Sequence, residues 1–406
     1  MKKNRDVSRE YHSLFFLYFI RFFGDAAFYG FFQLFVKSKN IGDTKIGILL
    51  SIAPIVLILM TPLWNKLAKN SNRNKLIITI TTVIEGLLII IMARMSTFES
   101  IMLITILISF VGTQFYSLID GFSGTFAAVN NKDYTPIRMF GSLGYIFGTI
   151  IMGQVITAFG FDYSFVIAGI MFLICSFLLY KLKPVDLELI SSEEKKPNYK
   201  KLFHNKRFYL YGIFYLLTFT LAFTGDNFFS LYLTSDTNGY GLSSGQWGYV
   251  YAGMVVLEVI SMLCISKFKI NDYILYSIAV LSLGIRWAFV GLDLGLVLTI
   301  VFSSLRGIGI GIFLGIHIKH LTKILNINNL TVGILIIQLF HNALLAVGNF
   351  ALPKFVEISS YPKVYLILGL FLIVIGIIYI IYGIFDDRDY ENKSLIKFYN
   401  KKTEKS

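Results

Sequence analysis

The chain has 406 residues, of which 55% are hydrophobic and 15% are charged, and its mean hydropathy is +0.68. A soluble globular domain carries about 25% charged residues, so this composition excludes one and indicates a protein embedded in a lipid bilayer. The formal net charge of +13 comes from basic residues scattered along short loops, which disfavours a nucleic-acid partner.

Apolar runs long enough to cross a hydrocarbon core of ~30 Å as helices recur along the chain, and about twelve are expected. The spans predicted in the first half are 12–36, 45–68, 75–94, 99–127, 136–158 and 163–182. Those predicted in the second half are 208–233, 245–266, 272–290, 295–322, 329–352 and 362–385. The predicted fold is therefore an all-α membrane protein, with a six-helix bundle over 1–180, a linker over 181–207, a second bundle over 208–385 and a tail over 386–406.

Basic residues concentrate in alternate connections, including the N-terminus, the linker and the tail. Because positively charged loops remain on the cytoplasmic side, both termini are predicted to be cytoplasmic in a protein of the plasma membrane. The first run is too long for a signal peptide and lacks a cleavage site, so it is expected to be an uncleaved span. Cys175 and Cys264 have no metal-binding spacing, and neither a metal nor a cofactor is predicted.

A short internal match relates the two halves. The segment FFGDAAF over 22–28 resembles FTGDNFF over 223–229. The same shift pairs three further positions: Gly47 with Gly248, Lys66 with Lys267, and Glu85 with Arg286. Matches that keep one register across two helices indicate a parallel repeat, and hence two six-helix bundles that face each other.

Ionisable side chains occur inside the predicted spans, where each costs about 2.5 to 3.5 kcal/mol near the bilayer centre on insertion scales. They are Arg21, Asp25, Glu85, Asp120, Arg138, Asp226, Glu258, Arg286, Arg306 and His341. Residues equally far from a tight turn lie at similar heights, so several of them are expected to form one polar layer near mid-membrane. Purely structural ion pairs are the alternative, above all for Arg21 and Asp25, four residues apart on one helix.

The stretch RMFGSLGY carries the most informative spacing. Arg138 and Tyr145 are seven residues apart and share a helix face, so a guanidinium and a ring edge are predicted to line one cavity wall. Gly141, Gly144 and Gly148 leave this helix thin and allow a neighbour to approach closely.

This stretch resembles the arginine, glycine and aromatic segment of the lactose permease, a sugar transporter of the major facilitator superfamily. VVLEVISMLCISKF and the IRW around Arg286 resemble the phenylpropionate permease branch of the same superfamily. The resemblance implies that Asp120 pairs with Arg138 and that Tyr145 replaces a sugar-stacking tryptophan. It also shows departures, because Arg306 and Gly309 stand where the permease has its proton-linked histidine and glutamate, and His341 stands where the family has a lysine.

Together these observations predict a monomeric, proton-coupled importer of a small polar solute, a sugar or glycoside ahead of a nucleoside. Substrate binding is assigned to Asp120, Arg138, Tyr145, Asp25 and Arg286. The proton-coupling charge network is assigned to Glu258, Asp226, Arg306, His341 and Glu85, with Glu258 and Asp226 as proton carriers and Arg306 and His341 as their switching partners.

Three alternatives remain open: uptake of an aromatic carboxylate, uniport without protons, and efflux of drugs or lipids. A membrane enzyme is disfavoured, because the sequence contains no HExxH or P-loop motif.

Overall fold

The computed structural model describes residues 2–67, 71–182, 202, 204–265, 270–325 and 327–403. These residues include 12 helices that are long and apolar enough to cross a membrane, and they contain no strand. The predicted all-α membrane fold is therefore confirmed. Lys267 and most of the linker expected over 181–207 lie outside the described residues.

The first half builds its spans from eight helices. They are α1 Lys2–Phe28, α2 Phe32–Ser38, α3 Asp43–Leu67, α4 Ser71–Met92, α5 Phe98–Gly112, α6 Phe115–Val129, α7 Thr135–Phe159 and α8 Phe161–Lys181. Helices α1 and α2 form one candidate span, and α5 and α6 form another.

The second half repeats the pattern. Its helices are α10 Lys206–Tyr215, the π-helix η2 Leu216–Thr220, α11 Leu221–Thr234, α12 Ser244–Ile265, α13 Asp272–Gly291, α14 Leu296–Ser303, α15 Leu305–Ile324, α16 Ile327–Ile358 and α17 Tyr361–Thr403. Here α10, η2 and α11 form one span, and α14 and α15 form another.

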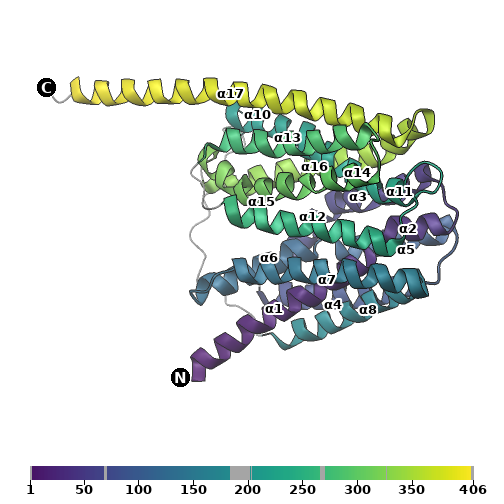
Figure 1. The fold of residues 1–406 in the computed structure, drawn as a ribbon. Helices are drawn as coiled ribbons and strands as arrows, with labels where there is room; N and C mark the ends of the chain where they lie inside the picture. The colour runs from purple at the N-terminus through teal and green to yellow at the C-terminus, as the bar shows by residue number, and fades with distance from the viewer. Residues whose placement is uncertain are drawn as a thin grey trace.

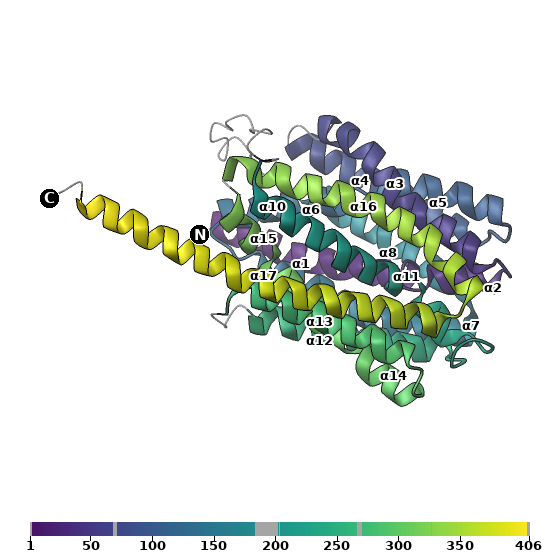
Figure 2. The same ribbon diagram turned by 90° about the horizontal axis from the view of Figure 1, so that it is seen from above.

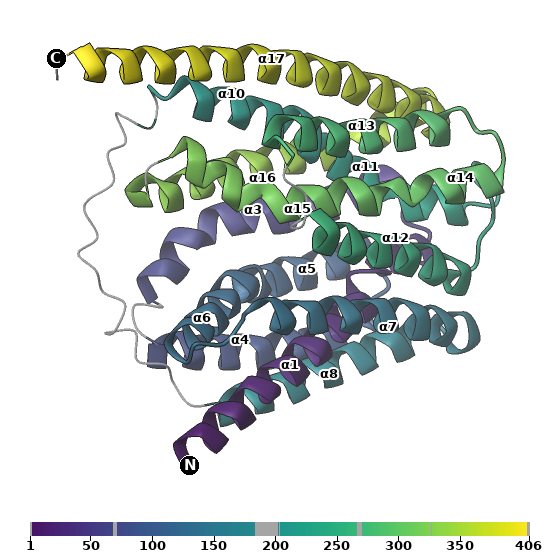
Figure 3. The same cartoon turned by 60° about the vertical axis from the view of Figure 1, so that its left-hand side comes forward.

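The helices run roughly along one direction, with most of the first half on one side and most of the second half on the other (Figure 1). Both chain ends lie on the same side of the molecule, which we call the terminal face, and we call the opposite side the far face (Figures 1 and 3). Helix α17 continues past its neighbours at the terminal face, as the view from above shows (Figure 2).

Several spans are interrupted partway along. Helix α1 ends just before Gly30, α5 ends before Thr113, α14 ends before Ser304, and a π-turn occupies Leu216–Thr220. Irregular backbone is tolerated at membrane depth only where protein buries it or where it lines a cavity. Of the residues at these breaks, Gly30 and Thr113 line a cavity, whereas Thr218–Thr220 of the π-turn are buried in protein.

The two halves pack together through α3 with α16 and through α7 with α12. Gly47 on α3 lies against the main chain of Asn349, and Gly248 on α12 lies against the main chain of Thr149. A β-carbon at either glycine would collide with a carbonyl oxygen of the other half, so only glycine allows this approach. These two glycines occupy the register that the repeat predicted.

Hydrogen bonds reinforce this contact near the far face. They run from Ser51 Oγ to the carbonyl of Ala346 at 2.8 Å, from Trp247 Nε1 to the carbonyl of Gly30 at 3.2 Å, from the amide of Gly245 to Thr157 Oγ1 at 2.9 Å, and from the Tyr361 hydroxyl to Asp43 Oδ2 at 2.6 Å. All of these residues lie in the parts of the spans nearer the far face, which is therefore the face at which the two halves are closed.

Candidate functional site

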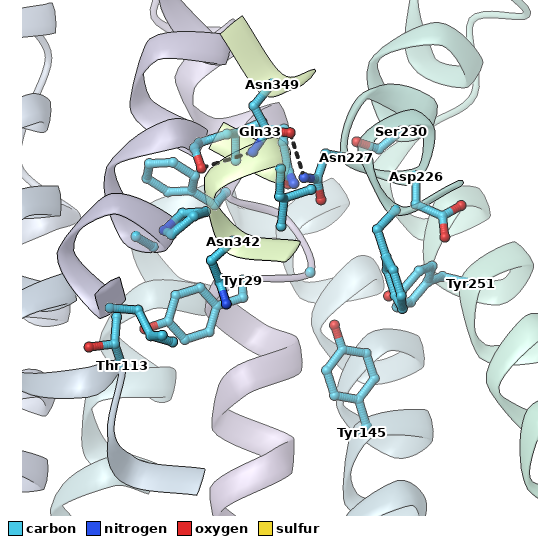
Figure 4. Close-up of a pocket in the computed structure, with 18 of the residues that line it drawn as sticks. Tyr29, Gln33, Thr113, Tyr145, Asp226, Asn227, Ser230, Tyr251, Asn342 and Asn349 are labelled. Carbon is cyan, nitrogen blue, oxygen red and sulfur yellow. Dashed lines mark hydrogen bonds between the residues drawn. The ribbon is translucent and has the colours of Figure 1, made fainter. Parts of the chain in front are cut away.

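A cavity of about 420 Å³ lies between the two halves (Figure 4). More than half of its lining is aromatic or polar without charge: Tyr29, Phe32, Gln33, Thr113 and Tyr145 from the first half, and Phe223, Asn227, Ser230, Trp247, Tyr251, Asn342 and Asn349 from the second. Its aliphatic lining residues are Leu50, Ala53, Pro54, Leu57 and Leu345. Its charged lining residues are Asp226 and Arg306. This volume falls within the range of small-molecule sites, and both bundles contribute to the wall.

Amide side chains form one side of the cavity. Asn227 Nδ2 donates to Asn349 Oδ1 at 2.8 Å, and Asn349 Nδ2 donates to the carbonyl of Leu50 at 3.0 Å (Figure 4). Asn342 Nδ2 donates to the carbonyl of Gln338 within its own helix at 2.8 Å. An amide can donate two hydrogen bonds and accept two, so these side chains keep capacity for a bound solute.

Aromatic rings form the other side. The Tyr145 and Tyr251 ring centroids are 5.7 Å apart, and those of Tyr251 and Trp247 are 5.1 Å apart. The Arg306 guanidinium lies 5.3 Å from the centroid of the Tyr251 ring. Such rings offer flat faces on which a ring of the solute can stack.

A charge cluster stands at this wall in the second half. Arg306 donates from Nε to Asp226 Oδ2 at 2.9 Å and from Nη1 to Glu258 Oε2 at 3.0 Å. Arg286 donates to Asp226 Oδ1 and lies 3.9 Å over the Trp287 ring. Asp226, Glu258, Arg286 and Arg306, all singled out from the sequence, are thus brought together, although Arg286 is fully buried behind the cavity wall.

A second cluster is buried in the first half. The Arg21 guanidinium forks onto Glu85 at 2.7 and 3.1 Å, and its Nε reaches Asp25 Oδ2 at 3.3 Å. The Tyr29 hydroxyl donates to Glu85 Oε1 at 2.9 Å, and the Tyr116 hydroxyl donates to Asp25 Oδ2. Arg21, Asp25 and Glu85 are at most 2% exposed, whereas Tyr29 also lines the cavity.

The expected pair of Asp120 and Arg138 is not formed. Asp120 Oδ1 instead accepts hydrogen bonds from the hydroxyls of Tyr18 and Tyr134, both at 2.7 Å, and no ion pair joins it to Arg138 in the described part of the chain. The Arg138 guanidinium lies 4.6 Å over the ring of Phe22. Similar height therefore did not bring these two side chains together, and the carboxylate contacts two tyrosine hydroxyls instead.

The expectation that Arg138 and Tyr145 line one wall also fails, because Tyr145 lines the cavity and Arg138 does not. Seven residues of helix separate them by about 10 Å along the axis, so one face does not mean one depth. Asp25 is likewise outside the lining. His341 meets Thr220 Oγ1 at 2.8 Å through Nδ1, and among the described residues the ion pairs of Asp226 and Glu258 go to arginines instead.

The amides of the cavity were not singled out from the sequence. Asn227, Asn342 and Asn349 lie in apolar spans where a polar side chain needs a partner or a cavity. That signal could have identified them, but a selection by charge alone does not include uncharged amides. Gln33, near the break after α1, is a further cavity residue of this kind that was not singled out from the sequence.

Comparisons with known proteins agree with this architecture. The model of the MFS_1 like family matches residues 11–351. The uncharacterized transporter YwbF of Bacillus subtilis (strain 168) is 27% identical over 327 residues, which cover 79% of this chain and 80% of that protein. The maltose permease of Geobacillus stearothermophilus is 23% identical over 137 residues, which cover 34% and 35% of the two chains.

Solved structures show the same fold. The nucleoside transporter NupG matches with a TM-score of 0.72 and 17% sequence identity, over 91% of this chain and 98% of that chain. A point mutant of NupG matches with a TM-score of 0.75 at the same identity and coverage.

Two bundles closed around a shared cavity define a membrane transporter of the alternating-access class. The chain belongs to the MFS_1 like family, and it is a multi-pass transporter of the major facilitator superfamily, as its resemblance to the permeases predicted.

Proposed function

We propose that the protein is a monomeric, proton-coupled importer of a neutral, ring-bearing polar solute, a sugar or a nucleoside, in the plasma membrane with both termini cytoplasmic. The observation that carries the proposal is the cavity between the halves, where amide groups face aromatic rings (Figure 4). Amides can hydrogen-bond the hydroxyls of such a solute, and the rings can stack on its face.

The charges at the cavity favour a neutral solute. Arg306 is already paired with two carboxylates, and Asp226 is paired with two arginines. A carboxylate solute would have to break one of these pairs, which leaves a buried charge without its partner. We therefore favour a neutral solute over an aromatic carboxylate as the substrate.

The relatives support the same solute class. NupG is a nucleoside transporter, and the Geobacillus protein is a maltose permease, so both named solutes are neutral polar molecules that contain rings. Closure at the far face by α3–α16 and α7–α12 supports a cycle in which the halves rock about the cavity.

Thermal unfolding of the detergent-purified protein with uridine, maltose or 3-phenylpropionate tests the solute class, because a ligand of the native state raises the melting temperature. Uridine or maltose is expected to stabilise the protein, and Asn342→Leu is expected to abolish that effect. Stabilisation by 3-phenylpropionate alone would replace the neutral solute by an anion.

Uptake into proteoliposomes tests coupling. The stabilising solute is expected to accumulate under an imposed inward proton gradient, and a protonophore is expected to abolish accumulation. Uptake that only equilibrates and ignores the gradient would make the protein a uniporter. Accumulation driven by an outward gradient would indicate efflux.

A further inference from the structure

The two buried charge clusters differ in their balance. In the second half, two carboxylates, Asp226 and Glu258, face two guanidinium groups, Arg286 and Arg306. In the first half, the two carboxylates of Asp25 and Glu85 share the single guanidinium of Arg21. The first cluster therefore has one more acid than base.

An excess buried carboxylate is costly at membrane depth, because water does not stabilise its charge and the one guanidinium is shared with a second carboxylate. Such a group avoids the cost by binding a proton and becoming neutral. The first-half cluster therefore needs one proton to match the balance of the second-half cluster.

The hydrogen bonds show which acid takes this proton. Glu85 accepts hydrogen bonds from both terminal nitrogens of Arg21 and from the hydroxyl of Tyr29, so both of its oxygens have donors. Asp25 receives the Arg21 Nε at 3.3 Å and the Tyr116 hydroxyl, and both reach Oδ2. Asp25 Oδ1 is buried and has no partner in the described structure.

We propose that Asp25 binds the coupled proton on its unpartnered Oδ1, and that Arg21 and Glu85 form the fixed ion pair beside it. This inference rests on the proton coupling of the proposed function. It differs from the expectation drawn from the sequence, which placed the proton on Glu258 or Asp226 and gave Asp25 to the solute.

Other charged and titratable groups near Asp25 do not remove the imbalance. Besides Arg21 on its own helix and Tyr29 in the turn that follows, they are Glu85 on α4, Tyr116 on α6, Arg138 and Tyr145 on α7 and Cys175 on α8. Arg138 lies 6.0 Å from the Tyr116 ring and adds one positive charge. Asp120 adds one negative charge in the same half, so the acids still exceed the arginines by one.

A path of contacts links this site to the cavity. Tyr29 lines the cavity and donates to Glu85, which holds Arg21, which in turn reaches Asp25. A solute that accepts a hydrogen bond from the Tyr29 hydroxyl removes one hydrogen-bond donor from Glu85. Glu85 then attracts Arg21 more strongly, the weaker contact of Arg21 with Asp25 loosens, and Asp25 holds its proton more firmly.

Solute and proton therefore favour each other, as symport requires. Asp25 is 2% exposed, so proton exchange with water needs a rearrangement around α1. Helix α7 is the neighbour against which α1 would move, because Gly144 and Gly148 place its main chain directly against α1.

Infrared difference titration of the protein in nanodiscs, without any solute, tests the proton site. A protonated buried carboxylic acid gives a carbonyl band that is lost when the acid ionises. The band is expected in the wild type and in Glu258→Gln, and it is expected to be absent from Asp25→Asn. A band that persists in Asp25→Asn, or one lost in Glu258→Gln instead, would overturn the assignment.

Transport gives the second readout, with the solute that stabilises the protein among uridine, maltose and 3-phenylpropionate. Asp25→Asn is expected to lose gradient-driven accumulation and to keep solute exchange between preloaded vesicles and medium. Accumulation that survives in Asp25→Asn would overturn the proposal. If none of the three binds while the infrared band depends on Asp25, the proposed function fails and the proton site stands.

Discussion

Asn227 donates a hydrogen bond to Oδ1 of Asn349 at 2.8 Å. Asn349 in turn donates to the carbonyl of Leu50 on α3, so the amide side of the cavity is tied to the contact that closes the far face. A solute that takes the hydrogen bond of Asn227 competes with this link. Binding and opening of the far face are thereby connected through one buried amide.

Replacing Asn349 by alanine removes both hydrogen bonds and is expected to open the far face more often. A net contribution of about 1 kcal/mol changes the closed-to-open ratio roughly fivefold. Pulsed electron spin resonance between labels on the exposed residues Lys45 and Lys354 measures this as a larger population of long distances. Asn342→Ala is the matched control, because its amide bonds Gln338 in its own helix. An equal shift in both variants would contradict the link.

Substitutions of Tyr145 and Arg138 distinguish the cavity in the structure from the binding site expected from the sequence. Tyr145→Ala removes a ring from the cavity wall and should raise the Kd of the solute about 5- to 10-fold. Arg138→Ala should leave the Kd unchanged, because Arg138 does not line the cavity. Isothermal titration calorimetry measures both values. A large loss in Arg138→Ala would return this arginine to the binding site.

Tyr29→Phe should disconnect the solute from the buried acids. The ring remains in the cavity, but the hydrogen bond of 2.9 Å to Glu85 is lost. We expect solute binding to persist while the proton uptake that accompanies it disappears, as measured with a pH-indicator dye in weakly buffered detergent solution. Tyr145→Phe is the control, since Tyr145 has no hydrogen bond to Glu85 in the described structure. Unchanged proton uptake in Tyr29→Phe would show that the path does not couple the two sites.

The first-half cluster should respond unequally to the loss of each partner. Arg21→Met leaves two buried carboxylates without a cation and is expected to cost about 3–5 kcal/mol of stability. Glu85→Gln should cost less, because Asp25, which already contacts Arg21, can release its proton and become the counter-ion of this arginine. Chemical denaturation in detergent, followed by tryptophan fluorescence, compares the two. Equal losses of stability in the two variants would mean that all three side chains stabilise the protein as one unit, and that neither carboxylate is in excess.

Hydropathy and the repeat predicted the architecture. The twelve spans were readable because the bilayer imposes one length and one solvent on every segment that crosses it. Gly47 and Gly248 were readable as a matched pair because a repeated bundle needs the same close approach twice. The local cost of charge in lipid also selected Asp226, Glu258, Arg286 and Arg306, which do cluster.

Partners across helices could not be read in the same way. Similar depth was compatible with a contact between Asp120 and Arg138. The rotation of the helices instead brings Asp120 into hydrogen bonds with two tyrosines. The sequence by itself determined which side chains must avoid lipid, because that depends on each residue and its span. Only the tertiary structure decided which of them meet, which line the cavity and which two acids share one arginine, because those outcomes depend on how twelve helices rotate and pack.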